Sequence, residues 1–132
     1  MIEHRDSTAN IEPRQLTEFF QDWLSLLSSE KHLEMLNKSD IVILAFDTEA
    51  NRVVGFVTAL TDFVQAAFIS LLEVIPSYRE QGIGTELMKR MLARLENVTA
   101  IDLTCNPELQ PFYARLNMLP SVGMIIRNDR KR

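Results

Sequence analysis

The sequence has 132 residues, of which 46% are hydrophobic and 24% charged, the proportions of an ordinary soluble globular domain. Its net charge of −4 argues against nucleic acid as the main partner and favours cationic substrates. No apolar run approaches the ~18 residues that a membrane span needs, and the polar N-terminus does not resemble a secretory leader, so no membrane association is expected.

The single cysteine, Cys105, cannot form an internal disulfide, and a cytoplasmic location is therefore expected. A chain of this length can bury one core but not two. We expect a single domain over residues 1–132, with a frayed, charged tail at about 128–132.

In the N-terminal third, Ile2 to Arg5 is compatible with a short strand. Pro13 suits the first position of a helix, and helical spacing of the apolar residues after it predicts an amphipathic helix with a mostly buried face, formed by Leu16, Phe19, Phe20, Trp23, Leu24 and Leu27. Ser28-Ser29 interrupts this pattern. A shorter helix is expected to follow and to end near Asn37.

Three apolar runs then follow with short connections, and they predict an antiparallel meander over Ile41–Phe46, Val53–Leu60 and Phe68–Ile75. After a proline and a glycine turn, apolar residues at helical spacing predict a helix from Gly82 to Glu96. Its crossover leads to Ile101–Thr104, which should lie parallel to the preceding strand.

The C-terminal part is expected to contain one more helix and one more strand. Asn106 and Pro107 suit a helix start, and Asn117 suits a left-handed helix end. Val122 to Arg127 is compatible with a last strand.

The order strand, glycine turn, helix suggests an anion site. Amide N–H groups in the first turn of a helix have no intrahelical partner, and Gly82 and Gly84 would let a phosphate approach the backbone. Arg79 could add a positive charge. Alternatively, the two glycines only let the chain turn. A P-loop is excluded because no lysine follows Gly84, and a dinucleotide fingerprint because Leu87 replaces its third glycine.

The glycine turn belongs to a longer pattern, Val74-x-Pro76-x-x-Arg79-x-x-Gly82-x-Gly84. This pattern resembles the acetyl-CoA signature of the GCN5-related N-acetyltransferase (GNAT) family, whose core is R/Q-x-x-G-x-G/A. The stretch from Asn106 to Met118 resembles the second family signature, N-x(6)-Y-x-x-x-G-F, with Asn117 and Met118 in place of its glycine and aromatic residue.

The resemblance implies an α/β (α+β) domain with a mixed, mostly antiparallel sheet flanked by helices. It also implies acetyl-CoA as the co-substrate. The residues expected to contact it are Leu72, Glu73, Val74, Arg79, Glu80, Gln81, Gly82, Ile83, Gly84, Thr85, Asn106 and Tyr113. Asn106 could instead only cap its helix.

Acetyl transfer to an amine needs a base for the amine and a proton donor for the departing thiolate. By resemblance, Tyr113 corresponds to the family's general acid, although it could simply pack beside Phe112. Glu73 interrupts an apolar strand and is the candidate base or binding group for a cationic acceptor; Asp102 and ordered water are the alternatives. Trp23 and the Ser28-Ser29 break lie where the family often builds its acceptor pocket.

These features predict an N-acetyltransferase that moves an acetyl group from acetyl-CoA directly to a primary amine. The alternative is a GNAT-fold sensor that binds acyl-CoA without turnover. The short chain and negative charge favour a small-molecule amine over a protein acceptor. No metal site is expected, because His4 and His32 lie in polar segments and have no partner at ligand spacing; both are expected at the surface. Dimers are common in the family, so a homodimer is a further expectation.

Overall fold

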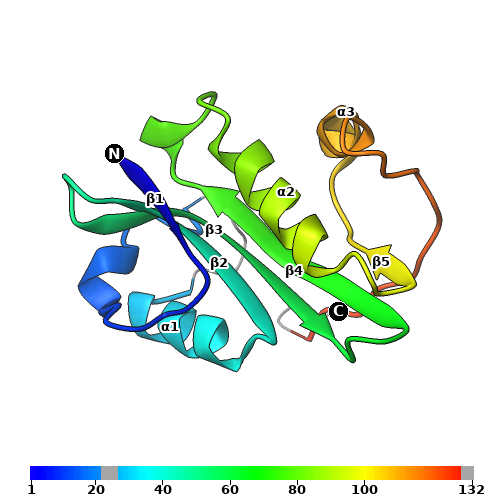
Figure 1. Ribbon diagram of the computed structural model, residues 1–132, viewed down its shortest axis with the longest axis horizontal. Coiled ribbons are helices and arrows are strands. Elements are labelled where there is room, and N and C mark those ends of the chain that lie inside the picture. The colour runs from blue at the N-terminus through cyan, green and yellow to red at the C-terminus, as the bar shows by residue number, and fades with distance from the viewer. Residues whose placement is uncertain (22–26, 129–132) are drawn as a thin grey trace.

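The computed structural model describes residues 1–21 and 27–128. A five-stranded sheet forms its centre, in the order β1 to β5 along the chain (Figure 1). The strands are β1 (Ile2–Arg5), β2 (Ile41–Asp47), β3 (Arg52–Thr61), β4 (Ala66–Val74) and β5 (Ala100–Asp102).

Strands β1 to β4 pair antiparallel, and β5 pairs parallel with β4. The helix α2 (Ile83–Arg94) makes the crossover between β4 and β5. This arrangement confirms the predicted meander, the parallel fifth strand and the mixed, mostly antiparallel sheet with flanking helices.

Helices cover both faces of the sheet, as two adjacent residues of β3 show. A Cβ atom at Gly55 would stand 3.2 Å from Ile83 and Leu87, so this side of β3 faces α2. The ring of Phe56 points the other way and contacts Phe19 and His32. Since neighbouring residues of a strand point to opposite faces, α2 and the N-terminal helical region lie on opposite sides of the sheet.

The prediction of a long amphipathic helix after Pro13 is wrong for the described residues. Only the 3₁₀ turn η1 (Pro13–Leu16) forms, and Glu18 and Phe20 have positive φ angles. The backbone of residues 17–20 bonds instead to residues elsewhere in the chain. An Arg52 guanidinium N–H donates to the Thr17 carbonyl at 2.6 Å, and the Phe20 N–H donates to a distant carboxylate. Phe19 and Phe20 are nevertheless buried, as expected for the core.

The next helix, α1 (Ser29–Lys38), confirms the shorter predicted helix. The Ser28 side chain accepts a hydrogen bond from the Lys31 N–H, so the predicted break is a helix N-cap. Trp23 and Leu24, which were expected to continue the first helix, lie outside the described residues, and with them the wall of the acceptor pocket expected at Trp23.

His32 is not at the surface, contrary to expectation. Its side chain is 1% exposed, packs against the rings of Phe19, Phe20 and Phe56, and has no hydrogen-bond partner within the described chain. Burial lowers the pKa of His32 from 6.5 to about 4. The imidazole is therefore neutral in the folded protein. The polar sequence around His32 did not indicate that this side chain is buried.

We expect His32 to make the fold acid-labile. The His32 side chain takes up a proton near pH 6.5 in the unfolded chain and only near pH 4 in the folded chain. The stabilising contribution of the neutral imidazole is therefore complete above pH 6.5 and is lost as the pH falls to about 4. The loss is on the order of 3 kcal/mol. Urea unfolding of the wild type and of His32→Leu at several pH values measures it; equal pH dependence in both proteins would contradict it.

The C-terminal part departs from expectation at its end. The predicted second helix appears as η3 (Pro107–Leu109) followed by α3 (Gln110–Ala114), and Asn117 has the predicted left-handed conformation. The Asn106 side chain makes no capping bond. The last strand expected over Val122–Arg127 is wrong: residues 119–127 form no strand, because no neighbouring strand pairs with them in the described chain. In residues 1–21 and 27–128, no helix is long and apolar enough to cross a membrane.

Candidate functional site

Strand β4 is irregular in its middle. Thr58 pairs with Leu71 but Ala59 pairs with Ile69, so Ser70 is an extra residue that forms a β-bulge. The Ser70 hydroxyl lies 2.8 Å from the Thr58 hydroxyl and fixes this bulge to β3.

Strands β4 and β5 then separate. Their ladder covers only Ala66 to Phe68 of β4, so residues 69–74 of β4 pair with β3 alone. Apart from the Val74 carbonyl, which accepts from Arg79 Nε, the backbone groups on the outer edge of this half of β4 have no strand partner in the described chain and can receive a ligand that enters between the two strands.

The glycine turn leads from β4 into α2 through the short turn η2 (Pro76–Tyr78). Gly82 is the N-cap of α2 with φ 84°, a conformation that other residues adopt only with strain. Among the described residues no side chain caps this helix, and its first intrahelical bond runs from the Glu86 N–H to the Gly82 carbonyl. The N–H groups of residues 83–85 are therefore left for an anion.

Two side chains brace this turn. Arg79 Nε donates to the Val74 carbonyl at 2.8 Å, which ties the turn to the end of β4. The Tyr78 hydroxyl donates to Asp47 Oδ2 at 2.6 Å, which ties it to the end of β2. This second bond holds the pKa of Asp47 below its ordinary value and raises the pKa of Tyr78.

A cleft of about 530 Å³ lies between β4, the glycine turn and α3. All the predicted cofactor residues line it except Gln81 and Asn106. It also includes residues that the sequence analysis missed, namely Tyr78, Leu109, Phe112 and Arg115. Leu109, Phe112 and Arg115 follow one another at three-residue spacing, and that helical spacing was the signal that could have found them.

Glu73 lies on β4 opposite Phe56, and so on the face of the sheet away from α2. Its side chain is 8% exposed, and each carboxylate oxygen accepts from the Phe20 N–H at 3.1 Å. This contact holds the N-terminal loop against the sheet across 53 residues of sequence. The carboxylate is thus a buried loop anchor beside the cleft, and its role as a base stays a prediction.

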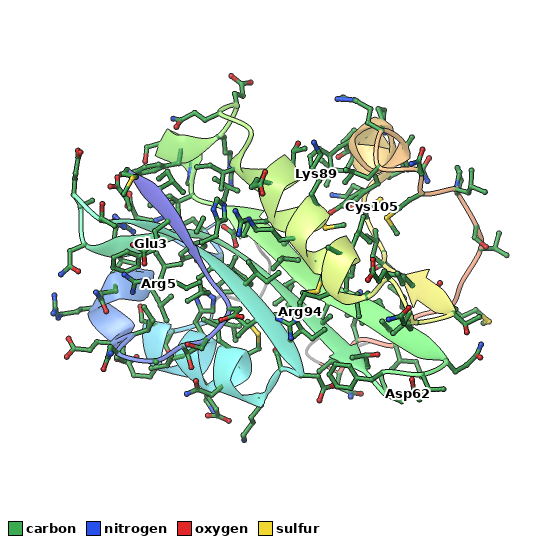
Figure 2. The ribbon with its side chains drawn as sticks, viewed as in Figure 1. Glu3, Arg5, Asp62, Lys89, Arg94 and Cys105 are labelled. Atoms are coloured by element: carbon green, nitrogen blue, oxygen red, sulfur yellow. The ribbon has the colours of Figure 1, made fainter. Side chains whose placement is uncertain are left out.

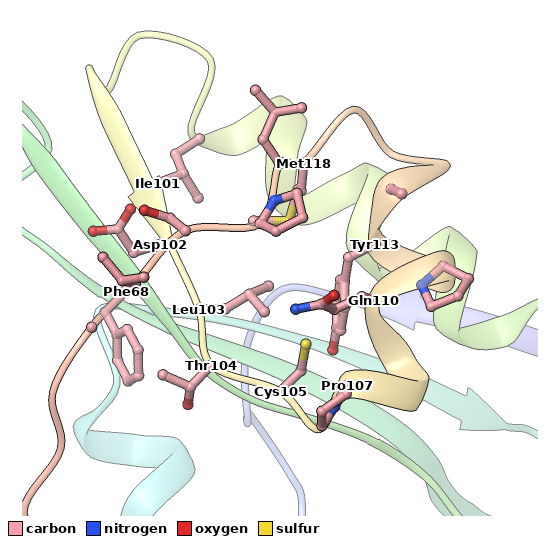
Figure 3. Close-up of a pocket in the computed structure, with 17 residues that line it drawn as sticks. Phe68, Ile101, Asp102, Leu103, Thr104, Cys105, Pro107, Gln110, Tyr113 and Met118 are labelled. Atoms are coloured by element: carbon pink, nitrogen blue, oxygen red, sulfur yellow. The ribbon is translucent and has the colours of Figure 1, made fainter.

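Tyr113 lies where two hollows meet. It lines the cleft described above and a second hollow of about 720 Å³ between the segment after β5, α3 and the C-terminal segment. Figure 3 shows Tyr113 across this second hollow from Leu103, with Cys105 beside it. Burial raises the pKa of the Tyr113 phenol, and the charge of a Cys105 thiolate would raise it further. The phenol therefore stays protonated at neutral pH.

The other candidates have weaker positions. Asp102, the alternative base, is exposed on β5 and lines the second hollow only. Cys105 is partly buried and lies between α2 and α3 in Figure 2. Over the part of the chain that the structure describes, no cluster of three or more His, Cys, Asp or Glu residues could hold a metal ion.

The chain is similar in sequence and fold to known acetyltransferases. The family model for the acetyltransferase (GNAT) family matches residues 5–118. A crystal structure from Deinococcus radiodurans R1, assigned to an acetyltransferase, has 35% sequence identity and a TM-score of 0.92, and the match covers 96% of this chain and 88% of that one. No curated protein matches the sequence.

Two further solved structures share the fold. A GNAT family acetyltransferase from Streptococcus pneumoniae TIGR4 has 26% identity and a TM-score of 0.78, with 98% of this chain and 100% of that chain covered. An aminoglycoside acetyltransferase from an uncultured soil sample, in complex with sisomicin, has 19% identity and a TM-score of 0.64, with 96% and 93% covered. The second likeness shows the fold alone.

Proposed function

Because the chain belongs to the GNAT acetyltransferase family, we propose that it moves an acetyl group from acetyl-CoA directly to a primary amine. The observation that carries this proposal is the cleft itself, in which the uncapped N-terminus of α2 and the Tyr113 side chain line one hollow. One end of the cleft offers donors to an anion, and the other offers an acid.

The residues present fit acetyl-CoA. The free N–H groups at residues 83–85 suit a pyrophosphate, and Arg79 and Arg115 add positive charge at the same cleft. A Cβ atom at Gly84 would make only ordinary contacts, at 3.9 Å from Val74 and 3.7 Å from Phe112, so the start of α2 lies close to both of these lining residues. The unpaired outer edge of β4 can hydrogen-bond an extended amide-containing arm.

When bound, acetyl-CoA supplies an activated acyl carbon, on which a C–N bond forms as the C–S bond breaks. The protein must then handle two protons. Glu73, directly or through water, takes a proton from the attacking amine. Tyr113 gives its phenolic proton to the thiolate that leaves, which its raised pKa permits because the phenol is still protonated at neutral pH.

We propose a small cationic amine as the acceptor. The net charge of −4 and the buried carboxylate of Glu73 both favour a positively charged molecule. Sisomicin, which is bound by the soil acetyltransferase that shares this fold, is such a molecule.

A thiol-release assay tests this function. Purified protein is incubated with acetyl-CoA and a panel of polyamines, aminoglycosides and amino acids, and acetylated products are identified by mass spectrometry. Thiol release that depends on one class of amine, with a product one acetyl group heavier, supports the transferase. Binding of acetyl-CoA without turnover across the whole panel would favour the alternative, an acyl-CoA sensor.

A further inference from the structure

The loop of residues 17–20, which supplies the Phe20 N–H that bonds Glu73, has an unusual backbone. Glu18 has a φ angle of 72° and Phe20 one of 64°. Residues with a Cβ atom rarely adopt this left-handed region, and for an aromatic residue it is an outlier. Such angles cost free energy and persist only where the surrounding structure imposes them. Contacts outside the loop must therefore hold it in this shape.

Glu73 holds one end of this loop, and Arg52 holds the other. The Nη2 group of Arg52 donates to the Thr17 carbonyl at 2.6 Å and to the Thr17 hydroxyl at 3.0 Å. Its Nη1 group donates to the Glu18 carboxylate. A planar guanidinium presents its donors in a fixed fork that reaches all three oxygens at once, whereas a lysine ammonium does not. Arg52 therefore fixes the start of the loop.

The part of the sheet that carries Arg52 is well anchored. Arg52 is the first residue of β3 and pairs with Asp47 across the β2–β3 hairpin. Its side chain is 21% exposed, and its Nε is buried without a hydrogen-bond partner in the described chain. Beside it, the buried Gln15 side chain donates to the Asn51 carbonyl at 3.2 Å. This end of the hairpin is therefore a firm base for the N-terminal loop.

The shape of the loop determines the environment of Glu73. The Phe20 N–H that meets both carboxylate oxygens takes its direction from the backbone of residues 17–20, which Arg52 fixes. Glu73 lines the cleft beside the glycine turn, whereas Arg52 lines neither of the two hollows. Any influence of Arg52 on the chemistry must therefore pass through the loop.

We propose that Arg52 is a positioning residue for the reaction. It holds residues 17–20 in the strained shape in which the Phe20 N–H orients the Glu73 carboxylate towards the attacking amine. Orientation matters because a base takes a proton efficiently only from within hydrogen-bond reach and at a suitable angle. The effect of Arg52 on turnover rests on the proposed function. Its hold on the contact between Phe20 and Glu73 does not.

Hydrogen exchange at the Phe20 amide tests this hold without any turnover. Arg52→Lys keeps the positive charge but loses the fork, and Arg14→Lys makes the same change in the exposed ion pair with Glu12. By NMR, the Phe20 amide is expected to exchange ~10-fold or more faster in Arg52→Lys, relative to amides in the centre of β3, and at the wild-type rate in Arg14→Lys. An unchanged ratio in Arg52→Lys would overturn the proposal.

Single-turnover kinetics test the effect on the reaction. With acetyl-CoA and the amine both saturating, Arg52→Lys is expected to react ~10-fold or more slowly than the wild type, and Arg14→Lys at the wild-type rate. The affinity for acetyl-CoA should not change, because Arg52 does not line its cleft. A wild-type rate in an Arg52→Lys protein whose Phe20 amide has lost protection would overturn the positioning role.

A double-mutant cycle shows whether Arg52 acts through Glu73. In a Glu73→Gln background the carboxylate that Arg52 positions is absent, so Arg52→Lys should change the rate by no more than about twofold. An equal loss of rate in both backgrounds would mean that Arg52 acts on the fold as a whole, which contradicts the proposal.

Thr17→Val is a milder second variant. Thr17 is exposed, and Val keeps the shape of the side chain while it removes the hydroxyl that accepts from Arg52. A smaller change in the same direction is expected for both Phe20 exchange and turnover. No change in either variant would overturn the proposal. If the wild type acetylates no amine, the proposed function fails, whereas the exchange rates still decide whether Arg52 holds the loop.

Discussion

Replacement of Tyr113 by Phe is expected to lower kcat by ~10²–10⁴-fold, the usual contribution of a general acid, with little change in the affinity for acetyl-CoA. The variant keeps the ring, which contacts Phe112 edge-on at 4.9 Å between centroids. Within the described residues no hydrogen bond involves the Tyr113 hydroxyl, so its loss should not disturb the fold. Only the proton donor is removed.

Single-turnover kinetics at saturating acetyl-CoA measure this loss, and calorimetry measures the affinity. Tyr78→Phe is the matched control. It also removes a phenol hydroxyl from this cleft, but one that is already bonded to Asp47. That variant is expected to lose about 1 kcal/mol of stability and to change kcat far less. If Tyr113→Phe turns over as fast as the wild type, Tyr113 only packs beside Phe112.

Replacement of Glu73 by Gln is expected to lower kcat by ~10²-fold or more, because an amide cannot take the proton of the attacking amine. The amide oxygen of Gln can still accept from the Phe20 N–H, so the loop anchor is kept and only the charge is lost. Single-turnover rates at saturating acetyl-CoA, measured for both proteins, test the base.

Glu73→Ala separates the chemical role from the anchor. It leaves the Phe20 N–H without this acceptor in a buried position, and we expect a loss of ~1–3 kcal/mol in the free energy of unfolding. If the Gln variant is active and the Ala variant is unstable, Glu73 only anchors the N-terminal loop and is not the base. The proton would then pass to Asp102 or to water.

The parts of the fold that could be predicted are those governed by local sequence. The apolar runs of β2, β3 and β4 predicted the meander. The spacing of Ile83, Leu87 and Met91 predicted the buried face of α2. The glycine turn was predicted for the same reason, since Gly82 has the positive φ angle that its residue type allows.

The rest depends on contacts between distant residues. Helical spacing after Pro13 could not reveal that the Phe20 N–H would bond Glu73, which lies 53 positions away. The bulge at Ser70 follows from the register with β3, which leaves no local pattern. Val122–Arg127 has a strand-like composition, but the sequence could not show that no strand of the described sheet would pair with it.

Calorimetric titration with acetyl-CoA tests the central claim most directly, on the wild type, Gly84→Ala and Gly84→Glu. A Cβ atom at Gly84 makes only ordinary contacts, at 3.7 Å from Phe112, and a carboxylate in the first turn suits a helix. Both variants should therefore fold, but the Glu side chain enters the cleft and repels an anion. We predict saturable binding by the wild type and the Ala variant, and none by the Glu variant. A folded wild type that does not bind acetyl-CoA would contradict the account.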